Sequence, residues 1–174
     1  AHILIVEDTA ADAELAQREI SKAIKNCQFL RVATQSEFLN ALETFNPDVI
    51  LSDFSMPHFN GMKALELALK HSPLTPLIIW TGSLSEDVAV ECMRAGANNY
   101  IIKDNIKRLG PAVLHALEER RLLVDQKDAE EKLRSSENRY RALFENTPVA
   151  IWEEDFSAVK NYLDALKQQG ITDF

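Results

Sequence analysis

The sequence predicts an α/β fold: a doubly wound, five-stranded parallel sheet in the flavodoxin-like order 2-1-3-4-5, with a long C-terminal helical extension. Two observations carry this prediction. Short apolar segments alternate with amphipathic segments five times before Arg108, and such an alternation places helices on both faces of a parallel sheet with right-handed crossovers. From Leu109 onward no helix-terminating residue follows for many turns, and Pro111 falls in the first turn, where a helix tolerates proline.

The strands are expected where the apolar segments are short and rich in β-branched residues, at 2–6, 29–32, 49–52, 77–80 and 100–102. The first helix should bury Ala13, Ala16 and Ile20 on one face. Capping and termination signals delimit the later helices. These signals are Ser36 and Pro47 for the second helix, Met62 and Ser72-Pro73 for the third, residues 83–86 and Gly96 for the fourth, and a start near Ile106 for the fifth.

Composition limits the classes of function. The chain has 174 residues, room for one full domain and part of another. Its net charge is −8, with no basic face, so nucleic-acid binding has no electrostatic support. The apolar runs are too short for a membrane span. Two cysteines, Cys27 and Cys92, cannot form a disulfide scaffold, and a reduced, cytoplasmic location is expected.

Reactive side chains follow four of the five predicted strands. Glu7 and Asp8 come after the first strand, Asp53 after the third, Thr81 after the fourth and Lys103 after the fifth. Open α/β sheets place their chemistry at the carboxyl ends of the strands, and the order 2-1-3-4-5 puts the ends of strands one and three side by side. The sequence therefore predicts one site at this edge of the sheet.

The residue types at this edge suit phosphoryl chemistry. Converging carboxylates repel one another, and Mg²⁺ relieves that repulsion in an open, oxygen-rich site. Asp53 can act as a nucleophile toward phosphorus, while Lys103 and the Thr81 hydroxyl can stabilise phosphoryl oxygens. Each residue alone has an ordinary alternative, as a helix cap, a turn residue or a solvated lysine. Such residues at four strand ends are hard to explain by coincidence.

The segments around these residues resemble the receiver domain of two-component response regulators. They are Ile-Leu-Ile-Val-Glu7-Asp8, Asp53-Phe-Ser-Met-Pro57 with Gly61, Trp-Thr81-Gly82 and Tyr100-Ile-Ile-Lys103. The resemblance implies that Asp53 takes phosphate from a histidine kinase or a phosphotransfer protein. It also implies that Asp8, Asp53 and the Ser55 carbonyl bind Mg²⁺ with help from Glu7, that Thr81 and Lys103 contact the phosphate, and that Thr81 and Tyr100 form the switch.

One departure from the family pattern follows the lysine. The family usually has proline there, often after a cis peptide bond, whereas this chain has Lys103-Asp104-Asn105. A cis bond to a non-proline residue costs about 3–4 kcal/mol, so a trans or a strained loop is expected. Asp104 also brings an extra carboxylate that could pair with Lys103.

The tail is expected to contain a linker helix over 113–145 that pairs with its copy in a parallel homodimer. The 3-4 spacing of a coiled-coil seam continues through this helix, although about half of the seam is polar. A single solvated helix is the alternative. The seam residues are Leu122, Gln126, Ala129, Leu133, Ser136, Tyr140 and Leu143.

Residues 136–152 resemble the entry to a PAS sensor domain. The sequence is therefore divided into a receiver domain at 1–122, the linker helix at 113–145 and an incomplete PAS-like segment at 146–174. In such arrangements the missing part is commonly a histidine kinase or a cyclic-dinucleotide enzyme. The chain as given is expected to carry no enzymatic activity beyond its own phosphorylation and dephosphorylation.

Two other functions compete with the receiver interpretation. A haloacid-dehalogenase-type phosphatase also uses an aspartate nucleophile and Mg²⁺, but it needs a second acid two residues later, where this chain has Ser55. Its nucleophile also normally follows the first strand. The other alternative is a receiver that is not phosphorylated and serves only as a dimer scaffold, which Asp104 leaves open.

Overall fold

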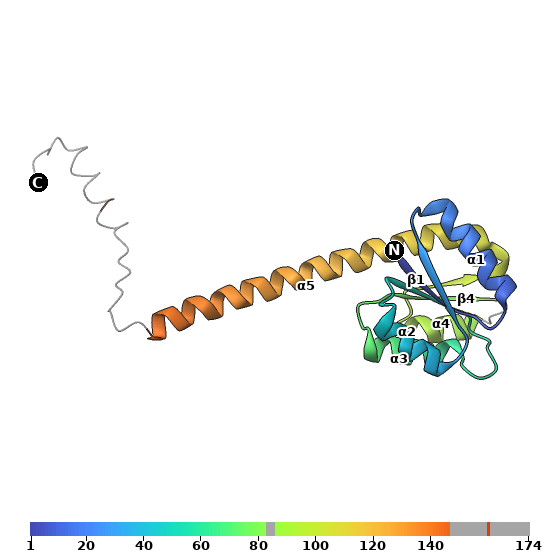
Figure 1. Cartoon of the computed structure of the whole chain (residues 1–174), viewed down its shortest axis with the longest axis horizontal. Helices are drawn as coiled ribbons and strands as arrows, with labels where there is room; N and C mark the ends of the chain where they lie inside the picture. The colour runs from blue at the N-terminus through green and yellow to red at the C-terminus, as the bar shows by residue number, and fades with distance from the viewer. Residues whose placement is uncertain (83–85, 147–159, 161–174) are drawn as a thin grey trace, which may run out of the picture. The chain divides into compact units, whose positions relative to one another are not determined.

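The computed structural model describes residues 1–82, 86–146 and 160. Its strands form one parallel sheet in the order β2-β1-β3-β4-β5, which confirms the predicted fold class (Figure 1). The elements are β1 (His2–Val6), α1 (Ala10–Ala23), β2 (Gln28–Val32), α2 (Gln35–Thr44), β3 (Val49–Ser52), α3 (Gly61–His71), β4 (Leu77–Thr81), α4 (Glu86–Arg94), β5 (Asn99–Ile102), the 3₁₀ helix η1 (Lys103–Arg108) and α5 (Leu109–Asn146).

The strand register brings the predicted site residues to one edge. In the β1–β3 pair Val6 lies opposite Ser52, so the following residues, Glu7 and Asp53, leave the sheet next to each other. In the β4–β5 pair Thr81 lies opposite Ile102, immediately before Lys103. The carboxyl ends of all four strands therefore converge, as the strand order requires.

Two hydrophobic clusters hold the helices against the sheet. Because successive strand residues point to opposite faces, alternate residues of β1 enter different clusters: Leu4 and Val6 join one, Ile3 and Ile5 the other. The first cluster packs under α2, α3 and α4, and the second under α1 and the beginning of α5 (Figure 1). Every residue of β1 after His2 is fully buried, so the sheet is a rigid platform for its edge.

The helix boundaries differ from the sequence prediction in two places. Ser36 is not the cap of α2; Thr34 is, and it forms a reciprocal capping box with Glu37. The fifth helix does not begin at Ile106, because η1 precedes α5. The left-handed terminator predicted at Gly96 is confirmed by its φ of 106°, whereas the predicted capping box at 83–86 begins outside the described residues.

The helix α5 is anchored to the opposite end of the sheet. Arg120 Nη1 donates to Asp48 Oδ1, and the other oxygen of Asp48 accepts the backbone N–H of His2 at 2.9 Å. Asp48 directly precedes β3, so a single acid ties the starts of β1 and β3 to the helix. Nothing in the sequence pattern predicted this contact.

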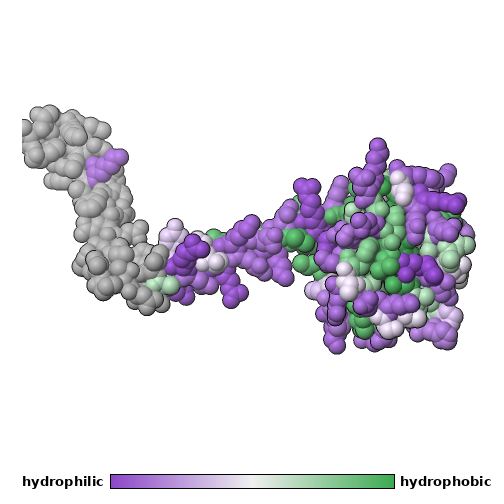
Figure 2. Space-filling view, in the orientation of Figure 1, coloured by the Kyte–Doolittle hydropathy of each residue, from purple (hydrophilic) through white to green (hydrophobic). Residues whose placement is uncertain are grey.

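Contacts divide the chain into two compact units, Ala1–Ala129 and Glu130–Phe174. Along α5 the seam residues Leu122, Leu133 and Tyr140 are exposed, in a surface that is otherwise largely hydrophilic (Figure 2). None of the described helices is long and apolar enough to cross a membrane. The predicted PAS-like entry at 136–152 begins within α5 and continues beyond the described residues, and the PAS-like segment at 146–174 lies almost entirely outside them.

Candidate functional site

Asp53 is held at the carboxyl end of β3 by its own backbone. Its N–H donates to Val6 O at 2.9 Å, which continues the ladder with β1 for one more residue. The backbone N–H of Ser55 donates to the Asp53 carboxylate oxygen Oδ1 at 3.1 Å. These bonds fix the carboxylate at the edge of the sheet.

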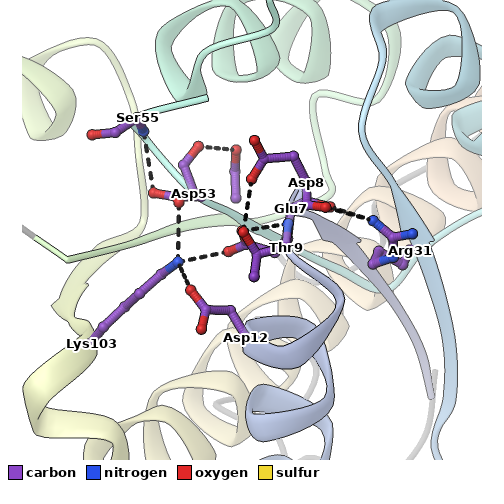
Figure 3. Close-up of polar contacts among 9 residues, drawn as sticks. Glu7, Asp8, Thr9, Asp12, Arg31, Asp53, Ser55 and Lys103 are labelled. Carbon is purple, nitrogen blue, oxygen red and sulfur yellow. Dashed lines mark hydrogen bonds and ion pairs between the residues drawn. The ribbon is translucent and has the colours of Figure 1, made fainter. Parts of the chain in front are cut away.

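Lys103 reaches across this edge and joins three carboxylates. Its ammonium lies 2.5 Å from Asp12 Oδ2, 2.8 Å from Glu7 Oε2 and 3.0 Å from Asp53 Oδ2 (Figure 3). The same nitrogen stands 4.8 Å from the ring centroid of buried Trp80, a cation–π contact. The ammonium therefore lies at the centre of the acidic group.

Burial and ion pairing act against each other on the pKa values of Glu7 and Lys103. Burial raises the pKa of Glu7 above its ordinary value, and the hydrogen bonds from Lys103 and the Thr9 backbone only partly offset this. For Lys103, burial lowers the pKa, but the hydrogen bonds to Asp12, Glu7 and Asp53 outweigh it and raise the pKa above the usual lysine value. Lys103 therefore carries its full positive charge at neutral pH.

Thr81 brings an unused donor to the same edge. It is the last residue of β4 and is fully buried, and its hydroxyl has no hydrogen-bond partner among the described residues. A buried hydroxyl without a partner is costly and calls for an explanation. Tyr100, the predicted second member of the switch, is partly buried on β5 and packs against the cluster under α2, α3 and α4.

Asp8 is exposed next to buried Glu7. Its carboxylate accepts a hydrogen bond from the Thr9 hydroxyl at 3.3 Å, and the Arg31 guanidinium donates to the backbone carbonyls of Glu7 and Asp8 at 3.0 and 3.2 Å (Figure 3). In the described part of the chain no group of three or more His, Cys, Asp or Glu side chains is arranged to hold a metal. The oxygen donors at this edge are nevertheless those that Mg²⁺ prefers, and Mg²⁺ needs only one or two protein carboxylates.

Sequence reasoning missed two residues of this site. Asp12 lies in the first turn of α1, not at a strand end, and Arg31 lies on β2. The sequence carries no local signal for either contact. The predicted pairing of Asp104 is not found: within the described ranges, the ion pairs of Lys103 are with Asp12, Glu7 and Asp53. The same ranges contain no cis peptide bond, so the Lys103-Asp104 bond is trans.

An acid pair, an aspartate, a hydroxyl and a lysine at neighbouring strand ends of an α/β domain form a site suited to phosphoryl chemistry. Comparison with known families makes this specific. The response regulator receiver domain family matches residues 3–114, and the chain belongs to this family.

Curated relatives match parts of the chain. The regulatory protein AtoC of Escherichia coli is 40% identical over 65 residues, which are 37% of this chain and 14% of AtoC. The DNA-binding transcriptional regulator NtrC of Klebsiella pneumoniae is 33% identical over 99 residues, 57% of this chain and 21% of NtrC. The chain thus spans about a seventh to a fifth of the length of these relatives.

Solved structures show the same fold. The signal receiver domain of a LuxO repressor protein from Vibrio parahaemolyticus superposes with a TM-score of 0.63 at 26% identity, covering 70% of this chain and 92% of that one. A response regulator receiver domain from Clostridium thermocellum gives a TM-score of 0.63 at 28% identity, covering 71% and 98%. Receiver domains are the phosphoacceptor modules of two-component systems; in general they bind Mg²⁺ and are phosphorylated by histidine kinases.

Proposed function

We propose that Asp53 is the phosphoacceptor of this chain, that a histidine kinase or a phosphotransfer protein supplies the phosphoryl group, and that α5 relays the phosphorylated state as part of a homodimer. The environment of Asp53 is the observation that supports its role as phosphoacceptor. Its carboxylate stands 3.0 Å from the Lys103 ammonium, at the same sheet edge as the unpartnered Thr81 hydroxyl.

The proposed transfer uses these groups directly. An Asp53 carboxylate oxygen forms a bond to phosphorus while the bond from phosphorus to the donor breaks, and the donor's leaving atom keeps the electron pair. Lys103 stabilises the phosphoryl oxygens as a fixed cation and donates a hydrogen bond. The Thr81 hydroxyl, which has no hydrogen-bond partner among the described residues, gains one in a phosphoryl oxygen, and Tyr100 on the neighbouring strand responds to that change.

The residues at this edge fit a magnesium ion. Asp8, Asp53 and the Ser55 carbonyl would hold it, with Glu7 assisting, and all four supply oxygen donors. When bound, the ion offsets negative charge on the reacting phosphoryl group. Arg31 contributes by fixing the backbone of Glu7 and Asp8 from the side away from Lys103.

Intact-mass spectrometry tests the acceptor. Acetyl phosphate with Mg²⁺ should add one phosphoryl group of about 80 Da to the wild type, the mass of one aspartyl-phosphate, and none to Asp53→Asn. Asp104→Asn removes an acid next to Lys103 and is the matched control, which should be labelled like the wild type. Equal labelling of wild type and Asp53→Asn would show that Asp53 is not the acceptor.

The same edge argues against a phosphatase of the haloacid-dehalogenase type. That chemistry needs an acid two residues after the nucleophile, and here Ser55 presents a backbone N–H to Asp53 instead. We therefore propose that this chain acts only on its own phosphoryl group. Any enzymatic activity of a longer protein would belong to other domains.

The relay through α5 rests on the exposed seam. Leu122 and Leu133 are more than half exposed on a helix whose other surface is mainly charged. Apolar side chains at coiled-coil spacing indicate a partner helix, and a second copy of α5 supplies the same pattern. A parallel arrangement follows from the role, since two receivers at one end then act on two downstream segments at the other.

Sedimentation equilibrium tests the dimer. Leu133→Asp places a charge in the middle of the seam and should convert the dimer to a monomer. Ser135→Asp makes the same change in charge two residues away, off the seam, and should leave the dimer intact. If both variants dimerise as the wild type does, the seam is not the interface.

A further inference from the structure

We propose that Asp12 is a placeholder for the phosphoryl group. In the unphosphorylated protein its carboxylate occupies a hydrogen-bond donor of Lys103 that a phosphoryl oxygen on Asp53 takes after transfer. Asp12 is thus a positioning residue that competes with phosphorylation. This inference rests on the proposed role of Asp53 as acceptor.

The argument begins with the donors of Lys103. An ammonium group has three N–H donors and no acceptor. Three carboxylates lie within hydrogen-bond distance of this one nitrogen, those of Asp12, Glu7 and Asp53 at 2.5, 2.8 and 3.0 Å (Figure 3). All three donors are therefore engaged, and a phosphoryl oxygen can bind Lys103 only if one carboxylate gives up its bond.

Burial decides which carboxylate gives way. The Glu7 side chain is 1% exposed and that of Asp53 is 11% exposed, whereas that of Asp12 is 36% exposed. An ionised carboxylate left unpaired inside the protein loses far more than one that water can solvate again. While one oxygen of Asp53 attacks phosphorus, the other keeps its bond to Lys103, and Glu7 cannot be rehydrated without opening the site. Asp12 is the partner that can be released.

The position of Asp12 in the fold supports this role. It lies on α1, whereas Glu7, Asp53, Thr81 and Lys103 all follow or end strands of the sheet. A side chain from the first turn of a surface helix can turn toward solvent without disturbing the strand ends. It also makes the shortest of the three bonds to Lys103, so in the unphosphorylated protein it holds the ammonium most closely.

The test compares the rate of labelling by acetyl phosphate with Mg²⁺ in four proteins, the wild type and three variants of this chain. Asp12→Asn keeps the shape of the side chain but removes its charge, and labelling at low acetyl phosphate should be about fivefold faster, the effect of losing one solvent-accessible ion pair. Asp12→Glu restores the carboxylate and should return the rate to that of the wild type. Glu14→Gln makes the same change in charge on the same helix, where Glu14 pairs with Arg18 and not with Lys103; it should label like the wild type.

A second measurement needs no phosphoryl transfer. In the presence of Mg²⁺, the concentration of beryllofluoride that half-saturates the protein should be lower for Asp12→Asn by about the same factor. If Asp12 had only a structural role, the substitution would change thermal unfolding and not this concentration. Asp12→Ala gives the same information if Asp12→Asn does not fold.

Equal rates for Asp12→Asn and Glu14→Gln would overturn the inference while the proposed function stands, as would slower labelling of Asp12→Asn. Failure of the wild type to be labelled at all would overturn the proposed function, and this inference with it.

Discussion

The ion pair between Arg120 and Asp48 should determine how firmly α5 is held on the receiver. Arg120→Gln removes the guanidinium and leaves a shorter, uncharged polar side chain. The neighbouring residue gives a matched control, because Arg121 is 82% exposed and its ion pair within the described residues is with Asp125, one turn along the same helix, at 3.8 Å. The two variants make the same chemical change at adjacent positions, and only one breaks a contact to the sheet.

The magnitude follows from the exposure of the pair. A charge-assisted hydrogen bond is worth about 1.5–3 kcal/mol when shielded, and an exposed ion pair about 0–1 kcal/mol. The side chains of Arg120 and Asp48 are 22% and 31% exposed, so solvent screens part of the interaction. We expect Arg120→Gln to lower the free energy of unfolding by about 1.5 kcal/mol, and Arg121→Gln by less than about 0.5 kcal/mol.

Urea unfolding measures this difference. Buried Trp80 reports the unfolding of the receiver by fluorescence, with Trp152→Phe as the common background. A double-mutant cycle with Asp48→Asn isolates the pair, since asparagine keeps an acceptor for the His2 N–H. If Arg120→Gln and Arg121→Gln unfold at the same urea concentration, or if the cycle gives no coupling energy, the anchoring role assigned to this pair is wrong.

Three further predictions concern local structure, each measured by the free energy of unfolding. Thr34→Ala should cost about 1 kcal/mol because Thr34 caps α2, while Ser36→Ala should cost almost nothing. Backbone N–H donation, chiefly from Ala33, lowers the pKa of Glu37 in the folded protein. The stability that Glu37 adds is therefore present above its ordinary pKa of 4.5 and is lost as the pH falls through the lowered value. If wild type and Glu37→Gln still differed in free energy of unfolding in strong acid, this prediction would be wrong. Gly96→Ala should cost about 1–3 kcal/mol because of its φ of 106°, whereas Gly82→Ala should be nearly neutral, because no described atom outside the neighbouring residues lies within 4 Å of the added Cβ.

Strand positions and most of the site could be predicted because both depend on local pattern. β1 and β3 are short, continuously apolar runs, which is how a strand buried on both faces reads in sequence. Once their order is known, the residues that follow them must share an edge. Thr34 was missed in favour of Ser36 because both residues can cap a helix, and only the reach of Glu37 back to the cap distinguishes them.

Asp12 and Arg120 could not be predicted in the same way. The partner of Asp12 is 91 residues away and that of Arg120 is 72 residues away. Neither contact is marked by a periodic sequence pattern, and neither follows from the order of the strands. Each depends on how a helix is rotated and tilted against the sheet, which side-chain packing determines. The charged surface of α5 gave no indication that one of its arginines forms an ion pair with a residue at the edge of the sheet.

The anchoring of α5 by Arg120 has a consequence for building chimeric signalling proteins. A fusion that joins another output module directly after Glu118 would discard Arg120, whose ion pair with Asp48 is part of the receiver. The receiver would then lose stability for a reason unrelated to the new module. Leu122 and Leu123 line an apolar pocket of about 410 Å³ beside Leu77 at the start of β4, so they too belong to the portable part. A junction placed after Leu123 keeps these contacts and leaves the exchanged sequence free to set its own pairing.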